Sequence, residues 1–472
     1  MYQPQYNYGM IGLGTMGCNL VLNMCDHGYS IAGYDKDEKK VTQLLALGED
    51  KKIGGFTDIA LFVAALESPK VVMLLVPAGV IVDAVLSDLM PFLKANDVVV
   101  DCGNSHFTDT QRRILTLAND GIHFMGLGVS GGETGARFGP SIMPGGNVTA
   151  YNKIAPMLQA IAAKVDGGEA CTAYMGQGAA GHYVKMVHNG IEYANMQMLA
   201  EAYHLLKIYA KQSNVQIHSI FNNWNKGRLQ SYLVEISAAI FLQKDDLGDG
   251  MLIDGIKDTA KQKGTGAWMS QDAMAIGAAI PAIDAAVCAR ILSSLKIERV
   301  AAANLFKNDE EIQVCKDVDT FIILLEEALY AAFILTYAQG LSMLQKASDT
   351  YKYEINIATV ASIWRGGCII RAAMLNDIMK AYTDEPKLIN MITSLTFKEA
   401  VNSCTVSLRK VVLLAVKSGT PVPSFCNNLQ YFDSYKSAWL PANLVQAQRD
   451  FFGAHTYERL DIEGVFHTKW GE

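Results

Sequence analysis

YGMIGLGTMGCNLVLNM, residues 8–24, carries the strongest structural signal of the chain. Its apolar start at 8–13 predicts a short buried strand, and the apolar spacing after Gly17 predicts a helix that ends at Gly28. The turn between them is GLGTMG, a Gly-x-Gly-x-x-Gly fingerprint in the strand–turn–helix context that it requires. Such glycines permit the turn, the approach of backbone to a pyrophosphate and the packing of helix on strand. The stretch predicts a dinucleotide-binding site; a turn that binds nothing is the alternative.

The end of the second predicted strand, at 30–34, bears on which dinucleotide binds. It is followed by Asp35, Lys36 and Asp37. A carboxylate at this point accepts hydrogen bonds from a ribose 2′-hydroxyl and repels a 2′-phosphate, which favours NAD. Lys36 acts in the other direction, because a cation here can pair with that phosphate. The alternative is that these are solvated turn residues.

Further short apolar runs, at 71–76, 98–102 and 123–128, predict more strands, with helical patterns between them. Strands that alternate with helices indicate a parallel sheet covered on both faces. We therefore predict an α/β Rossmann domain over residues 1–178.

The character of the chain changes after this domain. Ala-rich and Met-rich helical patterns, at 183–210, 271–300 and 318–346, predict a large all-α domain over residues 179–440. Residues 441–472 are polar and aromatic and have no core pattern of their own. They predict a C-terminal tail that either frays or docks, for example on a second subunit.

The composition excludes several classes of function. The 472 residues contain 40 Lys plus Arg against 47 Asp plus Glu, a net charge of −7 that argues against binding to nucleic acid or an anionic membrane. The richest apolar stretch is interrupted by Glu326 and Glu327 and is too short to span a membrane. The first residues lack the basic segment of a signal peptide, and the nine Cys show no paired spacing. We expect a cytoplasmic protein with reduced thiols.

Five polar residues with helical spacing form a candidate catalytic face: Lys185, His188, Asn189, Glu192 and Tyr193. Positions i, i+3, i+4, i+7 and i+8 lie on one face of a single helix. Lys185 and Glu192 are then about 10 Å apart along the axis, which allows a base and an acid to act on opposite ends of a small substrate. The alternative is an ordinary charged helix face.

Two glycine-containing segments could bind anions. Lys263, Gly264 and Thr265 offer a cation, backbone N–H groups and a hydroxyl to a phosphate, to which Arg290 and Arg449 could add bidentate contacts. The alternative is a flexible basic loop.

The other segment, Ser130-Gly131-Gly132, could bind a carboxylate, since the Gly-x-Ser-x-Gly elbow of a nucleophilic serine is missing. The His and Cys spacings predict no metal site.

Taken together, these segments resemble the 6-phosphogluconate dehydrogenase family. The resemblance extends over essentially the whole chain, through GLGTMG (12–17), VDCGNS (100–105), VSGGETGARFGPSIMPGG (129–146), GAAGHYVKMVHNGIEY (178–193), KGTGAW (263–268), GGCIIR (366–371) and PANLVQAQRDFFGAHTYE (441–458).

The resemblance implies oxidative decarboxylation of 6-phospho-D-gluconate to D-ribulose 5-phosphate and CO2, a step of the pentose phosphate pathway. It implies NADP as the usual cofactor, no metal, and a homodimer in which each tail reaches into the other subunit. Lys185 inherits the role of base and Glu192 that of acid.

The resemblance also assigns the binding residues. For the substrate they are Asn104, Ser130, Gly131, Gly132, His188, Asn189, Tyr193, Lys263, Thr265 and Arg290, with Arg449 and His455 of the partner subunit. For the cofactor they are Gly12, Leu13, Gly14, Thr15, Met16, Gly17, Asp35, Lys36, Asp37, Val76, Pro77, Ala78 and, between nicotinamide and substrate, Asn104.

The chain departs from the family at the ribose pocket. Members that use NADP usually have Asn-Arg-Thr in place of Asp35-Lys36-Asp37, and many have Lys at Pro77. Either NADP or NAD is therefore expected.

Two other functions stay open: another β-hydroxyacid dehydrogenase, acting on a short acid without phosphate, or a catalytically silent nucleotide-binding homologue. The joint presence of the phosphate-binding residues argues against the first, and that of Lys185 with Glu192 against the second.

Overall fold

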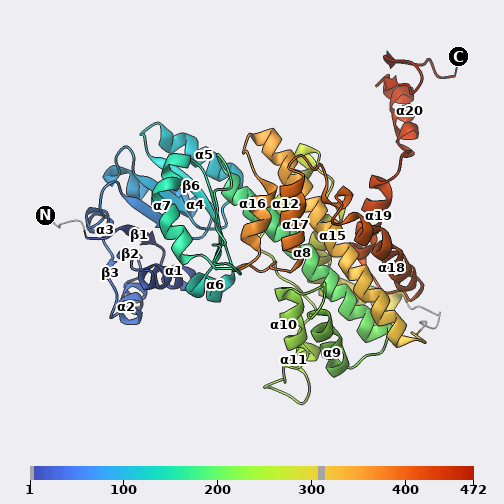
Figure 1. The fold of residues 1–472 in the computed structure, drawn as a ribbon, viewed down its shortest axis with the longest axis horizontal. Coiled ribbons are helices and arrows are strands. Elements are labelled where there is room, and N and C mark those ends of the chain that lie inside the picture. The colour runs from blue at the N-terminus through green and yellow to red at the C-terminus, as the bar shows by residue number, and fades with distance from the viewer. Residues whose placement is uncertain (1–4, 307–313, 472) are drawn as a thin grey trace.

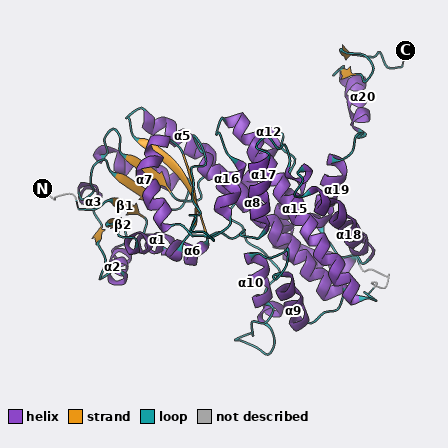
Figure 2. Cartoon of the chain, in the orientation of Figure 1, coloured by secondary structure: helices purple, strands orange, loops and turns teal. Residues whose placement is uncertain are grey.

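The computed structural model describes residues 5–306 and 314–471 (Figure 1). An α/β domain is joined to a larger helical domain, and a short tail stands away from both. Figure 2 shows that the strands are gathered in the first domain, apart from a small hairpin in the tail. The predicted fold class, a Rossmann domain followed by an all-α domain and a tail, is confirmed.

A seven-stranded sheet forms the centre of the first domain, in the order β3-β2-β1-β4-β5-β6-β7. The strands from β3 to β6 in this order are parallel, and β7 pairs antiparallel with β6. The bounds are β1 (Tyr8–Ile11), β2 (Ile31–Tyr34), β3 (Ile53–Phe56), β4 (Val71–Leu74), β5 (Val98–Asp101), β6 (His123–Ser130) and β7 (Ser141–Gly145).

Helices cover both faces of this sheet, so its central strands are continuous apolar runs. One face packs against α1 (Thr15–Asp26), α2 (Glu38–Leu47) and α7 (Val148–Ile161). The other packs against α3 (Ile59–Ala64), α4 (Val80–Leu89) and α5 (Phe107–Ala118). Two remaining elements of this domain are η1 (Met90–Phe92) and α6 (Gly132–Phe138).

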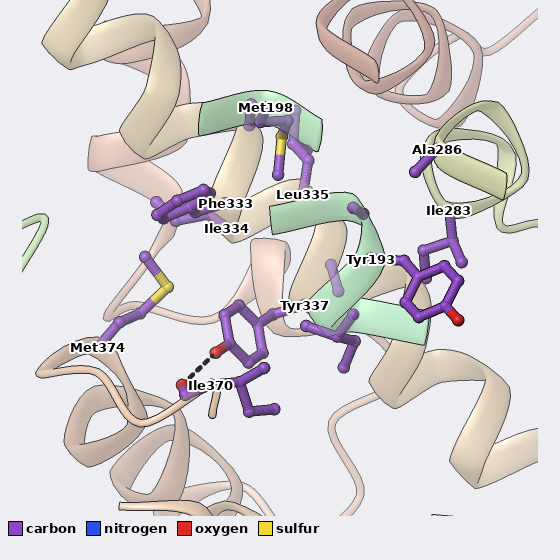
Figure 3. Packing of buried hydrophobic residues seen from close by; sticks show 14 of the residues in the cluster. Tyr193, Met198, Ile283, Ala286, Phe333, Ile334, Leu335, Tyr337, Ile370 and Met374 are labelled. Atoms are coloured by element: carbon purple, nitrogen blue, oxygen red, sulfur yellow. Dashed lines mark hydrogen bonds between the residues drawn. The ribbon is translucent and has the colours of Figure 1, made fainter. Parts of the chain in front are cut away.

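Two long helices form the centre of the helical domain: α8 (Ala180–His204) and α15 (Val318–Tyr351). Figure 3 shows their shared core, in which Tyr193 and Met198 of α8 lie among residues of neighbouring helices. The Tyr337 hydroxyl donates a hydrogen bond of 2.9 Å to the Ile370 carbonyl, which satisfies a polar group within this apolar core. Around them lie α9 (Asn214–Trp224), α10 (Tyr232–Ile240), α11 (Leu252–Gly255), α16 (Ile357–Trp364), α17 (Met374–Asp384), η3 (Met391–Thr393), α18 (Lys398–Lys417) and α19 (Pro423–Tyr435).

The helical pattern at 271–300 is divided among three helices: α12 (Thr265–Ile276), α13 (Pro281–Ser294) and α14 (Lys296–Leu305). Gly277 has φ of 69° and ends α12, after which Pro281 begins α13. The pattern predicted at 183–210 is α8 followed by one π-helical turn, Leu205–Tyr209. Within 5–306 and 314–471, no helix is both long and apolar enough to cross a bilayer.

The tail contains a helix that was not predicted, α20 (Ala442–Gly453), followed by the hairpin of β8 (Tyr457–Glu458) and β9 (Val465–Phe466). Asp450 holds these parts together. Its carboxylate accepts hydrogen bonds from the Thr456 and Thr468 N–H groups, at 2.9 and 3.0 Å, and from Trp470 Nε1 at 2.9 Å. The tail is thus folded on itself while α20 projects from the body of the molecule (Figure 1).

Candidate active site

The helix that carries the candidate catalytic face lies directly on the edge of the sheet. A Cβ atom at Gly128 of β6 would lie 2.5 Å from Lys185 Cβ, and one at Gly181 of α8 would lie 2.2 Å from the Gly126 carbonyl oxygen. Both distances are too short for any side chain, so these glycines allow α8 to contact β6. This contact fixes Lys185 at the carboxyl end of the sheet, where ligands bind in open α/β folds.

Lys185 and Glu192 lie two turns apart on α8, and burial shifts both toward their neutral forms. Lys185 is 7% exposed. Burial lowers the pKa of its ammonium, an effect that nearby Glu192 and Cys368 oppose. Burial raises the pKa of the Glu192 carboxyl, and the cations Lys185 and Arg290 oppose that change. A neutral amine and a protonated carboxyl are the forms that a base and an acid need.

A hydrogen-bonded row connects the end of β6 to the start of α12. His188 Nε2 lies 3.3 Å from Ser130 Oγ, and His188 Nδ1 lies 3.2 Å from Asn189 Oδ1. Asn189 Nδ2 then donates to Thr265 Oγ1 at 3.3 Å. Burial, together with the charge of Lys185, holds the pKa of His188 well below its usual value. The row therefore offers neutral polar groups beside Lys185.

Tyr193, the residue after Glu192 on α8, and Arg290 of α13 form the far end of the site. The Arg290 guanidinium lies 3.5 Å from the centre of the Tyr193 ring. This cation–π contact holds the side chain of Arg290 across from the α12 start. Lys263 is exposed in the loop before α12, where Thr265 is the first residue of that helix. Two cations and a hydroxyl are thus available for an anionic group.

The structure adds a segment to which the sequence assigned no site role. Gly131, at φ of 112°, lies against the Gly367 carbonyl, which would be 2.4 Å from a Cβ at Gly131. Buried Cys368 follows and interacts electrostatically with Lys185. The Trp364 ring packs edge-on against His188, with 5.6 Å between ring centres. The motif GGCIIR was visible as a match to the family, but its spacing gave no sign of this proximity.

The dinucleotide fingerprint is built as its glycines predict. Gly12 has φ of 95°, and a Cβ at Gly17 would lie 1.9 Å from the Gly12 carbonyl oxygen. Gly14 and Thr15 are exposed at the N-terminus of α1, and Gly14 has no side chain that could occupy the first N–H groups of the helix. These groups and the helix dipole can therefore receive phosphate. Val76 lies against this turn, since its Cγ1 would be 3.0 Å from a Cβ at Gly12.

At the expected ribose pocket, neither the Asp35 carboxylate nor the Lys36 ammonium is free of partners. Asp35 Oδ2 accepts from the Leu13 N–H at 2.9 Å, and Oδ1 accepts from the Asp37 N–H at 3.0 Å. Burial opposes ionisation of Asp35, but these N–H groups and Lys40 hold its pKa below the usual value. Lys36 pairs with Asp88, at 3.1 Å. One carboxylate oxygen of Asp35 is thus already hydrogen-bonded to the fingerprint turn.

Several predicted site residues stand at separate places. Asn104 is exposed in the turn after β5, as Pro77 and Ala78 are in the loop after β4. Arg449 and His455 lie in the projecting tail and do not join the site of their own chain. Within the described parts of the chain, no group of three or more His, Cys, Asp or Glu side chains is placed to hold a metal ion.

The fold and the site define a Rossmann-type dinucleotide-binding protein with a buried Lys paired with a half-buried Glu. The model of the "NAD binding domain of 6-phosphogluconate dehydrogenase" matches residues 7–183, and that of the "6-phosphogluconate dehydrogenase, C-terminal domain" matches residues 181–470. The chain belongs to the 6-phosphogluconate dehydrogenase family.

Curated relatives and a solved structure match over nearly the full length. A relative from Bacillus subtilis, 6-phosphogluconate dehydrogenase, NADP(+)-dependent, decarboxylating, is 48% identical over 98% of each chain. A decarboxylating 6-phosphogluconate dehydrogenase from Escherichia coli is 46% identical over 98% of each chain. The Plasmodium falciparum 6-phosphogluconate dehydrogenase, described in its apo form, with NADP+ and with 6-phosphogluconate, has a TM-score of 0.95 at 40% identity, covering 98% of this chain and all of that one.

Proposed function

We propose that this protein oxidises and decarboxylates 6-phospho-D-gluconate to D-ribulose 5-phosphate and CO2, with reduction of NADP+. The observation that carries the proposal is the pair of buried Lys185 and half-buried Glu192 on one face of α8, whose pKa values shift toward neutral amine and protonated acid. The chain also has a dinucleotide fingerprint at the start of α1 and the cations Lys263 and Arg290 for a phosphate. The names of the full-length relatives support the same activity.

The chemistry follows from the protonation states. The bound nicotinamide supplies an acceptor for the hydride that leaves C3 of the substrate. Neutral Lys185 takes the proton of the C3 hydroxyl, and the product is a β-keto acid. The bond from C2 to the carboxylate then breaks, CO2 leaves, and the electron pair moves to the C3 carbonyl, whose oxygen receives the proton back from Lys185. Glu192 finally protonates the carbon that lost CO2 while Lys185 takes the proton of the enol hydroxyl on C3, which gives the ketose.

The substrate is expected to lie along the polar row of α8. Its carboxylate meets Ser130, Gly131, Gly132, His188 and Asn189, beside Lys185. Its phosphate meets Tyr193, Lys263, Thr265 and Arg290. The support is geometric, since the hydrogen-bonded row and the cation–π pair mark two ends of one site.

The phosphate site is completed by a second copy of the chain. Arg449 and His455 of the partner subunit are expected at the phosphate, and α20 is the arm that brings them. Leu444, Phe451 and Phe452 are exposed on this arm, and apolar side chains so placed favour burial against another subunit. We therefore propose a homodimer with exchanged tails, and a cytoplasmic location that fits nine free thiols.

NADP is proposed as the cofactor, with NAD as the competing one. Lys36 and Lys40 lie at the ribose pocket, and Asp35 is partly occupied by backbone N–H groups, so a 2′-phosphate would meet cations there. The relative from Bacillus subtilis carries NADP(+) dependence in its name.

The test is the initial rate with 6-phosphogluconate, following reduced nicotinamide and released CO2, with NADP+ and NAD+ in parallel. We expect one CO2 for each reduced nicotinamide and a higher rate with NADP+. Turnover of a short 3-hydroxy acid in place of 6-phosphogluconate would assign the protein to another β-hydroxyacid dehydrogenase activity. Cofactor binding without any turnover would identify a silent homologue.

A further inference from the structure

Arg113 is a buried charge that the proposed mechanism does not use. It lies on α5 and is 1% exposed. A buried guanidinium is costly unless its N–H groups are paired, so the groups that pair with it indicate its role.

One side of Arg113 holds the loop that follows β4. Its Nε donates to Asp83 Oδ1 at 2.8 Å, and its Nη2 donates to Asp83 Oδ2 at 3.1 Å and to the Gly79 carbonyl at 2.9 Å. Gly79 precedes α4, has φ of 89°, and directly follows Pro77 and Ala78. The guanidinium therefore fixes the end of this loop to the first turn of α4.

The other side of Arg113 faces the turn that follows β5. Its Nη1 lies 3.6 Å from Asp101 Oδ2 and 3.5 Å from Ser105 Oγ. Asp101 shapes this turn, since its carboxylate accepts from the Gly103 N–H at 3.0 Å and from the Ser105 hydroxyl at 2.6 Å. Asn104 is the exposed residue between these two anchors. One guanidinium thus contacts both loops at the carboxyl ends of neighbouring strands.

The same turn is joined to the helix of Lys185. The Asp101 carbonyl lies 3.0 Å from His182 Nε2, and because a carbonyl only accepts, Nε2 carries the hydrogen. His182 Nδ1 then accepts from the Thr110 hydroxyl at 2.7 Å. His182 stands three residues before Lys185 on α8. The spacing between the β5 turn and Lys185 is therefore fixed by hydrogen bonds.

We propose that Arg113 is a positioning residue that locks the loop 75–79 to the turn 102–105, so that Asn104 and the nicotinamide end of the cofactor keep their place beside Lys185. The inference rests on the proposed function. Without the guanidinium, the β5 turn keeps its own bonds to Asp101 but loses its fixed distance from α4. Cofactor binding and the rate of the chemical step then fall, while the substrate site on α8 and α12 is unchanged.

Arg113→Met tests this, with Arg112→Met as the matched control. Arg112 is the neighbouring residue and also pairs with Asp83, at 2.9 Å, but its side chain is 53% exposed and contacts neither loop. The measurements are NADP+ affinity by calorimetry, kcat, and KM for 6-phosphogluconate. For Arg113→Met we expect NADP+ affinity and kcat each to fall about tenfold or more, since small misplacements of reacting groups carry large rate effects. KM for 6-phosphogluconate and every value for Arg112→Met should stay within about twofold of wild type.

Equal effects of the two substitutions, or a rise in the KM for 6-phosphogluconate as large as the loss of NADP+ affinity, would overturn the proposal. If Arg113→Met does not fold, Ser105→Ala removes one anchor of the same turn and leaves Arg113 and Asp101 in place. It should lower kcat and NADP+ affinity in the same direction by about threefold, and wild-type values would contradict the role of the turn. Calorimetry needs no turnover, so wild-type protein that binds NADP+ without oxidising 6-phosphogluconate would remove the proposed function and still leave Arg113 testable.

Discussion

The body of the molecule and its tail differ in how their polar groups are paired and in how far their apolar side chains are buried. In the body, α8 lies on β6 through Gly128 and Gly181, and the candidate base and acid lie on this one helix. In the tail, a small polar centre at Asp450 joins helix and hairpin, and large apolar side chains such as Phe451 stay exposed. In the proposed dimer we therefore expect the acid–base chemistry to need one chain, and the cations for the substrate phosphate to come from two.

The largest effect is expected at the candidate base, Lys185, which lies with Glu192 on one helix. Lys185→Met removes the base, and kcat should fall by at least about 10³-fold, within the range of a lost general acid–base group. NADP+ affinity, measured by calorimetry, should stay within about twofold, because the fingerprint turn is a separate part of the chain. A variant with a near-normal rate would remove Lys185 from the mechanism.

The next prediction concerns the phosphate site, to which the proposed dimer brings Arg449 of the partner subunit. Arg449→Ala should lower kcat/KM for 6-phosphogluconate by about tenfold to a hundredfold, the effect of losing one charged contact to phosphate. When Arg449→Ala and Lys185→Met chains are unfolded and refolded together, mixed dimers should recover activity. One of their two sites has an intact Lys185 and an intact Arg449 of the partner subunit.

The control for that experiment is each variant refolded alone, which should show only its own residual activity. Activity that fails to return in the mixture, with mixed dimers shown by mass spectrometry, would mean that the tail serves its own chain. That result would contradict the comparison.

A smaller effect is expected where α8 meets the sheet. Gly128→Ala places a methyl group 2.5 Å from Lys185 Cβ, so α8 must shift. We expect a loss of about 1 to 3 kcal/mol in the free energy of unfolding, the usual cost of overpacking. Chemical denaturation measures it, and Gly14→Ala, where a Cβ meets no atom within 4 Å, is the matched control. Equal stability of the two variants would show that the helix–sheet contact is not tight.

The smallest effect is expected at the ribose pocket. Asp88→Asn releases Lys36 from an exposed ion pair, so the lysine becomes available to a 2′-phosphate. The ratio of kcat/KM for NADP+ to that for NAD+ should rise about twofold to fivefold, in keeping with the modest strength of exposed pairs. Asp58→Asn, a substitution of another surface carboxylate in this domain, is the control. An unchanged ratio for Asp88→Asn would exclude Lys36 from cofactor selection.

Sequence periodicity was sufficient for the fold class and for the polar face of α8, because a single helix carries that face and 3.6 residues per turn place its members. It failed where tertiary contacts decide. Gly277 and Pro281 divide a long apolar pattern into separate helices, and β7 pairs antiparallel in a segment with little strand character. The tail helix was missed because its large apolar side chains, such as Leu444 and Phe452, stay exposed and form no core pattern.

Parts of the site were also beyond sequence reasoning. The contact of Cys368 with Lys185 joins segments far apart in the chain, and no local pattern encodes it. The position of Asp35, bonded to the Leu13 N–H, is a matter of side-chain direction in a turn. Both are fixed by packing between elements, whereas a motif reports only the order of residues along one element.

The most direct test of the central claim, that burial shifts Lys185 toward its neutral form and Glu192 toward its protonated form, is the pH dependence of kcat/KM for 6-phosphogluconate. Burial lowers the pKa of Lys185 and raises that of Glu192. Activity should therefore be lost at low pH, where Lys185 gains a proton, and at high pH, where Glu192 loses one. The account predicts a bell-shaped profile, with an acidic limb well below the ordinary lysine pKa of about 10.4 and an alkaline limb that Glu192→Gln removes. A profile that rises continuously to about pH 10 would show an ordinary lysine and contradict the account.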